Sequence, residues 1–249
     1  MPADQFFSHA TAAQLHGLPL PARLARRETV DVASTVRSRR RHGTGVAGHL
    51  VAAGLARVVD VDGLRTSSAV ASWCQLSTWL TLNELTAVGD ALVRRQDPPS
   101  DLEELGRAVR GHSGRPGARR LRNAFDLVRP GTDSPKETEL RLLLIRAGLP
   151  EPEVNPQLFN RFGAFIAYGD LVYRRYRVLI EYDGEQHRDD DWQFHHDIDR
   201  LDGVMEEGWR VIHVDKHHLR INPAAIIVRV RTALIERGWT PRDGAGRCR

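Results

Sequence analysis

Residues 169–187 read GDLVYRRYRVLIEYDGEQH, and this stretch decides the fold of the second half of the chain. Its later part, Arg177–Asp183, predicts a strand whose side chains alternate between the two faces of a sheet. Glu181 and Asp183 therefore share one face at the end of an otherwise apolar strand. Gly184 follows directly and opens the chain into a loop. The pattern predicts two carboxylates at the lip of a sheet.

A third carboxylate, Asp170, lies among apolar neighbours in the extended run Ala164–Tyr173. If this run forms a hairpin with the next strand through Arg174–Arg175, Asp170 and Glu181 come close across the ladder. Carboxylates crowded in an apolar setting repel one another unless they are protonated or bridged by a cation. Oxygen-only ligands favour a hard divalent ion, Mg²⁺ or Mn²⁺. The sequence therefore predicts a metal site formed by Asp170, Glu181 and Asp183.

A purely structural role is the competing interpretation of these acids. Carboxylates at strand ends commonly pair with basic side chains, and Arg174, Arg175 and Arg177 are close in sequence. Three acids in register, followed directly by Gln186 and His187, favour the metal site over this alternative.

The turn-rich segment RPGTDSP, residues 129–135, predicts a boundary between a domain of residues 1–128 and a domain of residues 129–249. The first region mixes helical and extended patterns, which predicts an α+β domain. Its expected elements are helices over 7–18, 68–80, 82–95, 101–109 and 118–128 and strands over 29–32 and 58–61.

The second region predicts an α-β-β-β-α-β-α order and hence an α/β fold. Ser134 is the expected N-cap of its first helix, which runs to about Ala147. Glu137 suits the capping-box position and also continues an inward-facing apolar stripe, and both roles stay open. The later elements are strands over 153–158, 164–173, 177–183 and 209–214 and helices over 190–207 and 223–237.

Three stretches of this region resemble the endonuclease-like domain related to very-short-patch repair endonucleases. They are SPKETELRLLLIRAGLP, GDLVYRRYRVLIEYDGEQH and HDIDRLDGVMEEGWRVIHV. The resemblance implies the restriction-endonuclease-like α-β-β-β-α-β core of the PD-(D/E)XK class, and metal-dependent cleavage of DNA. It also implies a helix acid at Glu137, a metal-binding Asp170, a strand pair at Glu181 and Asp183, and a polar or basic catalytic group at Gln186 or His187.

The chain departs from the class motif at one position. The motif has a lysine two residues after the glutamate, where this chain has Asp183, and the nearest other lysine is Lys216. His187 is chemically suited to deprotonate water, because an unperturbed imidazole has a pKa near ~6.5. The departure leaves the general base open between His187 and a carboxylate, and it allows an inactive copy of the fold.

The charge of the chain is carried almost entirely by arginine. The formal net charge is +4, and Lys136 and Lys216 are the only lysines. Arginines cluster without acids over residues 107–122 and again over residues 37–41, which predicts contacts to nucleic-acid phosphates. A coding bias towards arginine is the alternative explanation. The predicted nucleic-acid-binding residues are Arg39, Arg40, Arg115, Arg119 and Arg120.

The first region also resembles the domain of AbiEi-type antitoxins, on FSHATAAQLHGLPLP, VDGLRTSSAVASWCQL and ELTAVGDALVRR. That resemblance implies a regulatory module that faces DNA or a partner. Three functions therefore compete: an endonuclease acting on DNA, a non-catalytic antitoxin-type DNA-binding regulator with a degenerate nuclease fold, and a nuclease acting on RNA.

The remaining composition favours a cytoplasmic protein with no membrane partner. No apolar run approaches the ~18 to 20 residues of a membrane span, and the N-terminus lacks a signal-peptide pattern. Two cysteines, Cys74 and Cys248, are too few to suggest a disulfide framework.

Overall fold

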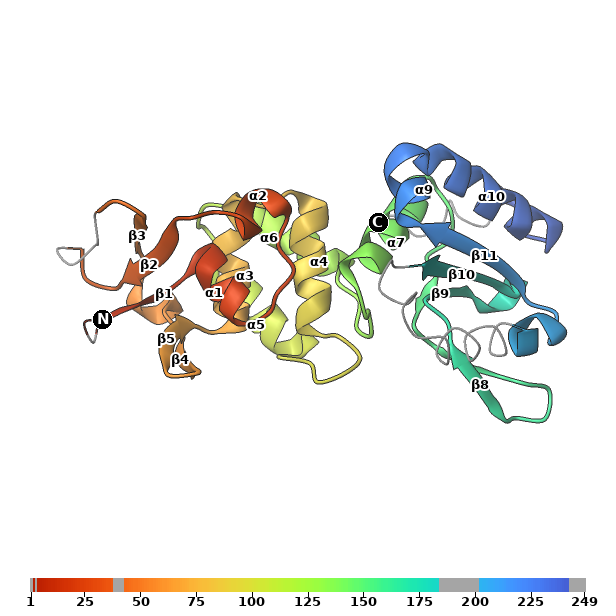
Figure 1. Cartoon of the computed structure of the whole chain (residues 1–249), viewed down its shortest axis with the longest axis horizontal. Helices are drawn as coiled ribbons and strands as arrows, with labels where there is room; N and C mark the ends of the chain where they lie inside the picture. Colours follow the sequence, from red (N-terminus) through yellow and green to blue (C-terminus); the bar gives the residue numbers. More distant parts are fainter. Residues whose placement is uncertain (1, 3, 38–42, 184–201, 242–249) are drawn as a thin grey trace. The chain divides into compact units, whose positions relative to one another are not determined.

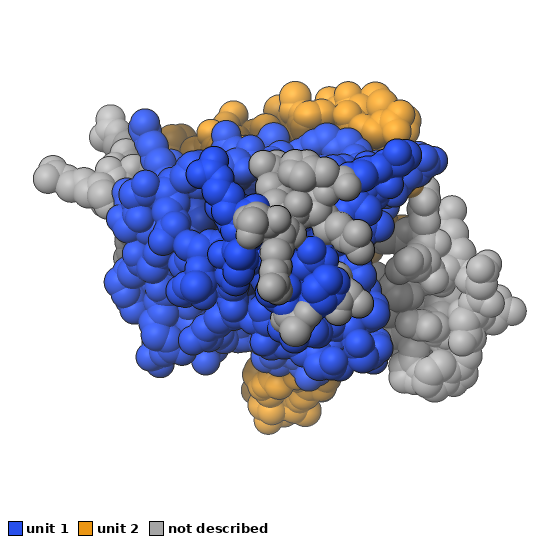
Figure 2. All heavy atoms as spheres, turned by 90° about the vertical axis from the view of Figure 1, so that its left-hand side faces the viewer, with its two compact units in different colours: residues 1–131 blue, residues 132–249 orange. Residues whose placement is uncertain are grey.

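The chain divides into two compact units, residues 1–131 and residues 132–249 (Figures 1 and 2). The computed structural model describes residues 2, 4–37, 43–183 and 202–241. The first part of the turn-rich linker, residues 129–131, belongs to the first unit, and its backbone is hydrogen-bonded there. The Arg129 N–H donates to Asp90 Oδ1 (2.8 Å), and the Gly131 N–H donates to the Val93 carbonyl (3.1 Å).

Unit 1 contains a mixed five-stranded sheet in the order β3-β2-β1-β5-β4. Strand β1 runs antiparallel to β2 and parallel to β5, so two segments distant in sequence flank it. Its Phe6 side chain is buried against Ala33 of β2 and Val51. The strands are β1 (Gln5–Phe7), β2 (Val30–Ser34), β3 (Val46–Leu50), β4 (Val58–Val61) and β5 (Leu64–Ser67).

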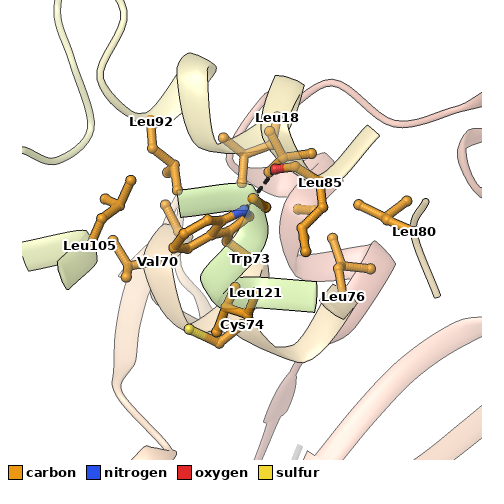
Figure 3. Close-up of a cluster of buried hydrophobic side chains, with 14 of the residues drawn as sticks. Leu18, Val70, Trp73, Cys74, Leu76, Leu80, Leu85, Leu92, Leu105 and Leu121 are labelled. Atoms are coloured by element: carbon orange, nitrogen blue, oxygen red, sulfur yellow. Dashed lines mark hydrogen bonds between the residues drawn. The ribbon is translucent and has the colours of Figure 1, made fainter. Parts of the chain in front are cut away.

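The helices of unit 1 pack around one buried tryptophan. Trp73 is fully buried, and its indole N–H donates to the Leu85 carbonyl (2.8 Å) (Figure 3). Each buried leucine around it contributes about 1.5–3 kcal/mol by leaving water. The helices are α1 (His9–Leu15), α2 (Ala22–Ala25), α3 (Ala69–Gln75), α4 (Leu82–Leu92), α5 (Leu102–Gly111) and α6 (Ala118–Leu127), with short 3₁₀ turns η2 (Ala53–Leu55) and η3 (Leu76–Thr78).

Two predictions for unit 1 were incomplete. The helix expected from Phe7 begins only at His9, because Gln5–Phe7 forms the central strand β1. Strands β3 and β5 were not predicted, since each is short and neither shows a strict alternation of buried and exposed residues.

Unit 2 contains a four-stranded sheet in the order β11-β10-β9-β6 and a separate two-stranded sheet of β7 and β8. Strands β9 and β10 form the predicted antiparallel hairpin, joined by the 3₁₀ turn η4 (Arg174–Tyr176). Strand β11 is parallel to β10. The strands are β6 (Glu153–Val154), β7 (Gln157–Phe159), β8 (Phe165–Tyr168), β9 (Leu171–Tyr173), β10 (Val178–Asp183) and β11 (Arg210–Asp215).

Three helices cover one face of the four-stranded sheet: α7 (Pro135–Arg146), α9 (Lys216–Ile221) and α10 (Pro223–Glu236) (Figure 1). Leu140 of α7 and Val230 of α10 are fully buried in the cluster that contains the sheet residues of this face. The opposite face carries a smaller cluster, which includes Leu179, Val172, Leu158 of β7 and Val204.

The predicted strand 164–173 is wrong as a single element. It is two strands, β8 and β9, that belong to different sheets and are separated by Gly169 and Asp170. A side chain at position 169 has no room, because a Cβ there would lie 2.5 Å from Leu179 Cδ1. The chain therefore bends at a glycine packed against β10, and Asp170 lies at the break.

The described residues show a mixed α/β fold, as the sequence predicted at that level. The helix expected over 190–207 lies largely outside the described residues, but residues 202–206 are helical and are followed by Gly208 with φ 81°. Among the helices that the structure describes, none is both long and apolar enough to cross a bilayer.

Candidate functional site

Strand β10 presents its two acids at its carboxyl end. Glu181 and Asp183 alternate with Ile180 and Tyr182, so the two acids share the face on which Leu179 is buried. Glu181 is 7% exposed, whereas Asp183 is exposed. The strand thus carries one buried and one solvent-facing carboxylate, side by side on one face.

The bend between β8 and β9 brings Asp170 to this end of β10. Strands β9 and β10 are antiparallel and Ile180 pairs with Leu171, so Asp170, directly before β9, lies at the level of Glu181, directly after Ile180. The Tyr182 N–H donates to Asp170 Oδ2 (2.7 Å). The Asp170 carboxylate therefore contacts the β10 backbone at the residue between the two acids, where β9 no longer supplies a backbone acceptor.

Helix α7 adds a fourth acid, Glu137, which is 5% exposed. Ser134 is the N-cap as predicted, because its Oγ accepts from the Glu137 N–H (3.2 Å). The carboxylate itself turns inward: Glu137 Oε2 accepts from Asn155 Nδ2 (2.7 Å) and from the Asp133 N–H (3.1 Å). The inward-facing role of Glu137 is thus confirmed.

Asn155 connects the helix acid to the bend. Its side chain donates to Glu137, and its backbone N–H donates to the Asp170 carbonyl (3.0 Å). It is buried and adopts a left-handed conformation with φ 44°, which asparagine tolerates better than most residues. The sequence predicted a single strand over 153–158 and missed this residue, although Asn155-Pro156 within that run is a signal for an irregular backbone.

The electrostatics of Glu137 show that the acids are crowded. Burial raises the pKa of Glu137, and the neighbouring Asp170 carboxylate raises it further, to about 7. The hydrogen bonds from Asp133 and Asn155 act in the opposite direction but are outweighed. Glu137 and Asp170 therefore interact as like charges, an arrangement that a bound cation would relieve.

No metal centre is preformed among the described residues. Within them, no three His, Cys, Asp or Glu side chains are grouped so that they could hold an ion. The donor set is nevertheless all oxygen, which is the chemistry that Mg²⁺ and Mn²⁺ prefer. Asp170, Glu181 and Asp183 would have to turn their carboxylates towards one another to share an ion.

The parallel strand β11 brings further polar residues to the same edge of the sheet. Asp183 pairs in register with Asp215, and Lys216 follows at once. Asp215 caps α9 by accepting from the His218 N–H (2.7 Å), and this hydrogen bond is the main reason that the pKa of Asp215 is lowered. Lys216 therefore lies one residue after Asp215, which is paired with Asp183.

The predicted catalytic residues Gln186 and His187 lie outside the described residues, as do Arg39 and Arg40. The other predicted nucleic-acid-binding residues lie together in unit 1. Arg115, Arg119 and Arg120 line one pocket at the start of α6, with a volume of about 610 Å³.

A hairpin of unit 2 exposes three phenylalanines that the sequence analysis did not single out. Phe159 and Phe165 are about half exposed on β7 and β8, and Phe162 is 82% exposed in the turn between them. The Arg161 guanidinium lies over the Phe162 ring (5.1 Å). Exposed aromatic rings beside arginine form surfaces on which nucleic-acid bases stack. The signal was the aromatic run FNRFGAF around a predicted turn.

Comparisons with protein-family models, with curated proteins and with solved structures find no match to this chain. The resemblances described above therefore stay predictions. A function has to be inferred from the carboxylates of unit 2 and from the charged and aromatic surfaces.

Proposed function

We propose that unit 2 is a divalent-metal-dependent endonuclease that hydrolyses phosphodiester bonds in DNA on a PD-(D/E)XK-like core. The observation that supports this most is the position of Asp170. Its carboxylate accepts from the β10 backbone between Glu181 and Asp183, and it raises the pKa of Glu137. Buried acids that repel one another in this way are typical of sites that bind a cation or move protons.

Asp170, Glu181 and Asp183 would hold the ion. Glu137 would help to position Asp170 through Asn155, which donates to both residues. A bound Mg²⁺ or Mn²⁺ would polarise a phosphate oxygen and lower the pKa of water. The protein residues would orient the phosphate and exclude bulk water, because β10 is buried up to Glu181 and only Asp183 is exposed. This layout matches a site open on one side to a large substrate.

The general base is proposed to be His187, with Glu181 as the alternative. His187 follows the strand that carries the acids, and a neutral imidazole can accept a proton near neutral pH. A His187→Ala variant should then lose roughly 10²-fold in turnover with unchanged DNA binding. If that variant turns over normally while Glu181→Gln does not, the carboxylate carries the proton.

DNA is proposed as the partner because cationic and stacking groups are both exposed. The phenylalanine hairpin offers rings to bases, and Arg115, Arg119 and Arg120 offer charge to phosphates. Binding should weaken steeply with salt, and replacing the three arginines together should flatten that dependence.

A non-catalytic DNA-binding regulator is the second candidate. One observation favours it: no three acidic or histidine side chains among the described residues are grouped for metal binding. In this case Glu137, Asp170 and Glu181 would form a structural network, and the fold would serve as a binding platform.

Plasmid cleavage by the full chain separates the two candidates. Cutting should require Mg²⁺ or Mn²⁺, stop with EDTA, and be lost in Asp170→Asn, which keeps an acceptor for the Tyr182 N–H but removes the charge. Glu206→Gln is the matched control, because Glu206 is an exposed acid of the same unit. Cutting that persists in EDTA, or equally in Asp170→Asn and in the control, would overturn the nuclease. Metal-independent DNA binding without any cutting would favour the regulator.

A further inference from the structure

The pocket at the start of α6 is lined by three arginines and by no acidic residue. It is lined by Arg115, Gly117, Ala118, Arg119, Arg120 and Asn123, and no carboxylate lines it. Its volume of about 610 Å³ lies within the range of roughly 300–1,000 Å³ that small-molecule sites occupy. Three guanidinium groups therefore face a concave space large enough for a nucleotide.

No acidic side chain in the described part of the chain forms an ion pair with the arginines of the pocket. Arg115 and Arg119 are exposed and form no ion pair with any residue that the structure describes. Arg120 is oriented by a hydrogen bond from its Nη1 to the Ser77 carbonyl (3.0 Å). Like charges held this close repel one another, and an anion between them would remove that repulsion.

The backbone at the pocket adds donors of the same sign. Helix α6 is ten residues long, begins at Ala118 and has no acid in its first turn. Its N-cap, Gly117, has φ 83° and supplies no side chain to the free N–H groups. Of these, the N–H groups of Arg119 and Arg120 donate to no acceptor among the described residues. The helix dipole places about half a positive charge at this end.

A buried hydroxyl lies directly behind this N-terminus. Ser77 is 1% exposed, and its Oγ has no hydrogen-bond partner among the described residues. It faces Gly117, since a Cβ on that glycine would lie 2.2 Å from Ser77 Oγ. This contact leaves no space for a side chain at position 117, so the start of α6 is held by close packing of its N-cap glycine on Ser77.

We infer that this pocket binds a phosphate monoester of a nucleotide, either free or at the 5′ end of a DNA strand. A phosphate dianion matches paired guanidinium groups, and it accepts hydrogen bonds from the free N–H groups of a helix start. The remaining volume, flanked by Asn123 and Leu82, accommodates the sugar and base. This site belongs to unit 1 alone and does not depend on the carboxylates of unit 2.

Binding of a fluorescent single-stranded oligonucleotide with a 5′-phosphate, compared with its 5′-hydroxyl form, tests the inference. The full chain is used in EDTA, so cutting cannot contribute. The phosphorylated strand should bind roughly tenfold or more tightly. Competition with a free nucleoside monophosphate separates the two sources: displacement of the strand at a concentration similar to that of the strand indicates that the free nucleotide suffices, and weak displacement indicates a site for the strand end. Inorganic phosphate that competes as well as the nucleotide would contradict recognition of a nucleotide.

Matched variants show whether the pocket is responsible. The pair Arg115→Ala and Arg119→Ala should abolish the preference for the 5′-phosphate. The control pair Arg26→Ala and Arg65→Ala removes the same charge from exposed positions of the same unit and should keep it. No preference in the wild type, or an equal loss in the control pair, would overturn the inference. An unchanged preference in Asp170→Asn would show that this result is independent of the nuclease.

Discussion

Two buried carboxylates, one in each unit, are surrounded in opposite ways. The Asp31 side chain in unit 1 is fully buried but lies beside a cation: Arg27 Nη1 is 3.4 Å from Oδ2, and the His49 ring binds the other oxygen, with Nε2 2.9 Å from Oδ1. Glu137 in unit 2 is nearly as buried, yet the neutral Asn155 amide and the Asp133 N–H donate to it, and its charged neighbour is Asp170. Burial alone therefore does not mark a functional acid. The sign of the neighbouring charges distinguishes a structural carboxylate from one that is poised to bind a cation or a proton.

Replacing Asp31, the structural carboxylate, should have the greatest effect on stability. Asp31→Asn leaves the Arg27 guanidinium without its charge partner and disturbs the contact with the His49 ring, and breaking such a pair at a buried carboxylate costs about 3 kcal/mol of unfolding free energy. Chemical denaturation followed by circular dichroism measures this loss. Metal-dependent cutting per folded molecule should stay unchanged, so a selective loss of cutting would mean that Asp31 is not merely structural.

Glu137, the carboxylate of the candidate site, should make the stability of the chain depend on pH. The pKa of Glu137 is raised in the folded state to about 7, so the folded chain holds this proton more tightly than the unfolded chain does. Its contribution to stability is full below about pH 4.5 and is lost as the pH rises through about 7, on the order of 2–3 kcal/mol. Denaturation across this window should show a decline that Glu137→Gln flattens. An equal decline in the variant would assign it to other groups.

A divalent ion should substitute for that proton. At pH 8, where Glu137 is ionised, Mg²⁺ should stabilise the chain by about 1–2 kcal/mol at concentrations well above its Kd, and by less at pH 6. Thermal unfolding with Mg²⁺ or EDTA at both pH values measures the difference. Asp31→Asn should retain the Mg²⁺ effect, and Asp170→Asn should lose it. Stabilisation that is independent of pH and of Asp170 would place the ion elsewhere.

A smaller effect separates the contributions of burial and of the neighbouring charge to the pKa of Glu137. Asp170→Asn removes the like charge beside Glu137 but leaves its burial, which is the larger cause of the raised pKa. The Glu137 pKa, followed by NMR of its side-chain carboxyl, should fall by a fraction of a unit and stay above about 4.5. A return to the ordinary value would mean that charge, rather than burial, dominates.

The regular elements around the candidate site were predictable, and the contacts that complete it were not. Strand β4 and the start of α7 matched their expected positions, because alternation and the Ser-Pro cap are local signals. The pairing of β9 with β10 followed from the turn at Arg174–Arg175. The bend at Gly169 could not be read from the sequence, since the close approach of Leu179, which excludes a side chain there, comes from the next strand.

The side chains that contact the acids could not be predicted from the sequence either. Glu137 fitted a capping box on spacing alone, but its carboxylate turns to Asn155, which lies in a separate irregular segment. The sequence places Lys216 beyond the last strand, and only the parallel pairing of β10 with β11 brings its neighbour Asp215 beside Asp183. Local pattern indicates which residue types are present, whereas long-range packing decides which of them meet.

The linker between the units determines where the chain can be divided for study. The backbone N–H groups of Arg129 and Gly131 donate to Asp90 and to the Val93 carbonyl, so these two residues are part of unit 1. A fragment ending at residue 128, the boundary that composition suggests, would leave the Asp90 carboxylate without that N–H and fray its last helix. A second fragment should begin no later than Asp133, whose N–H binds Glu137. Cutting the gene after codon 131 preserves both sets of contacts, and limited proteolysis should yield fragments with ends close to this position.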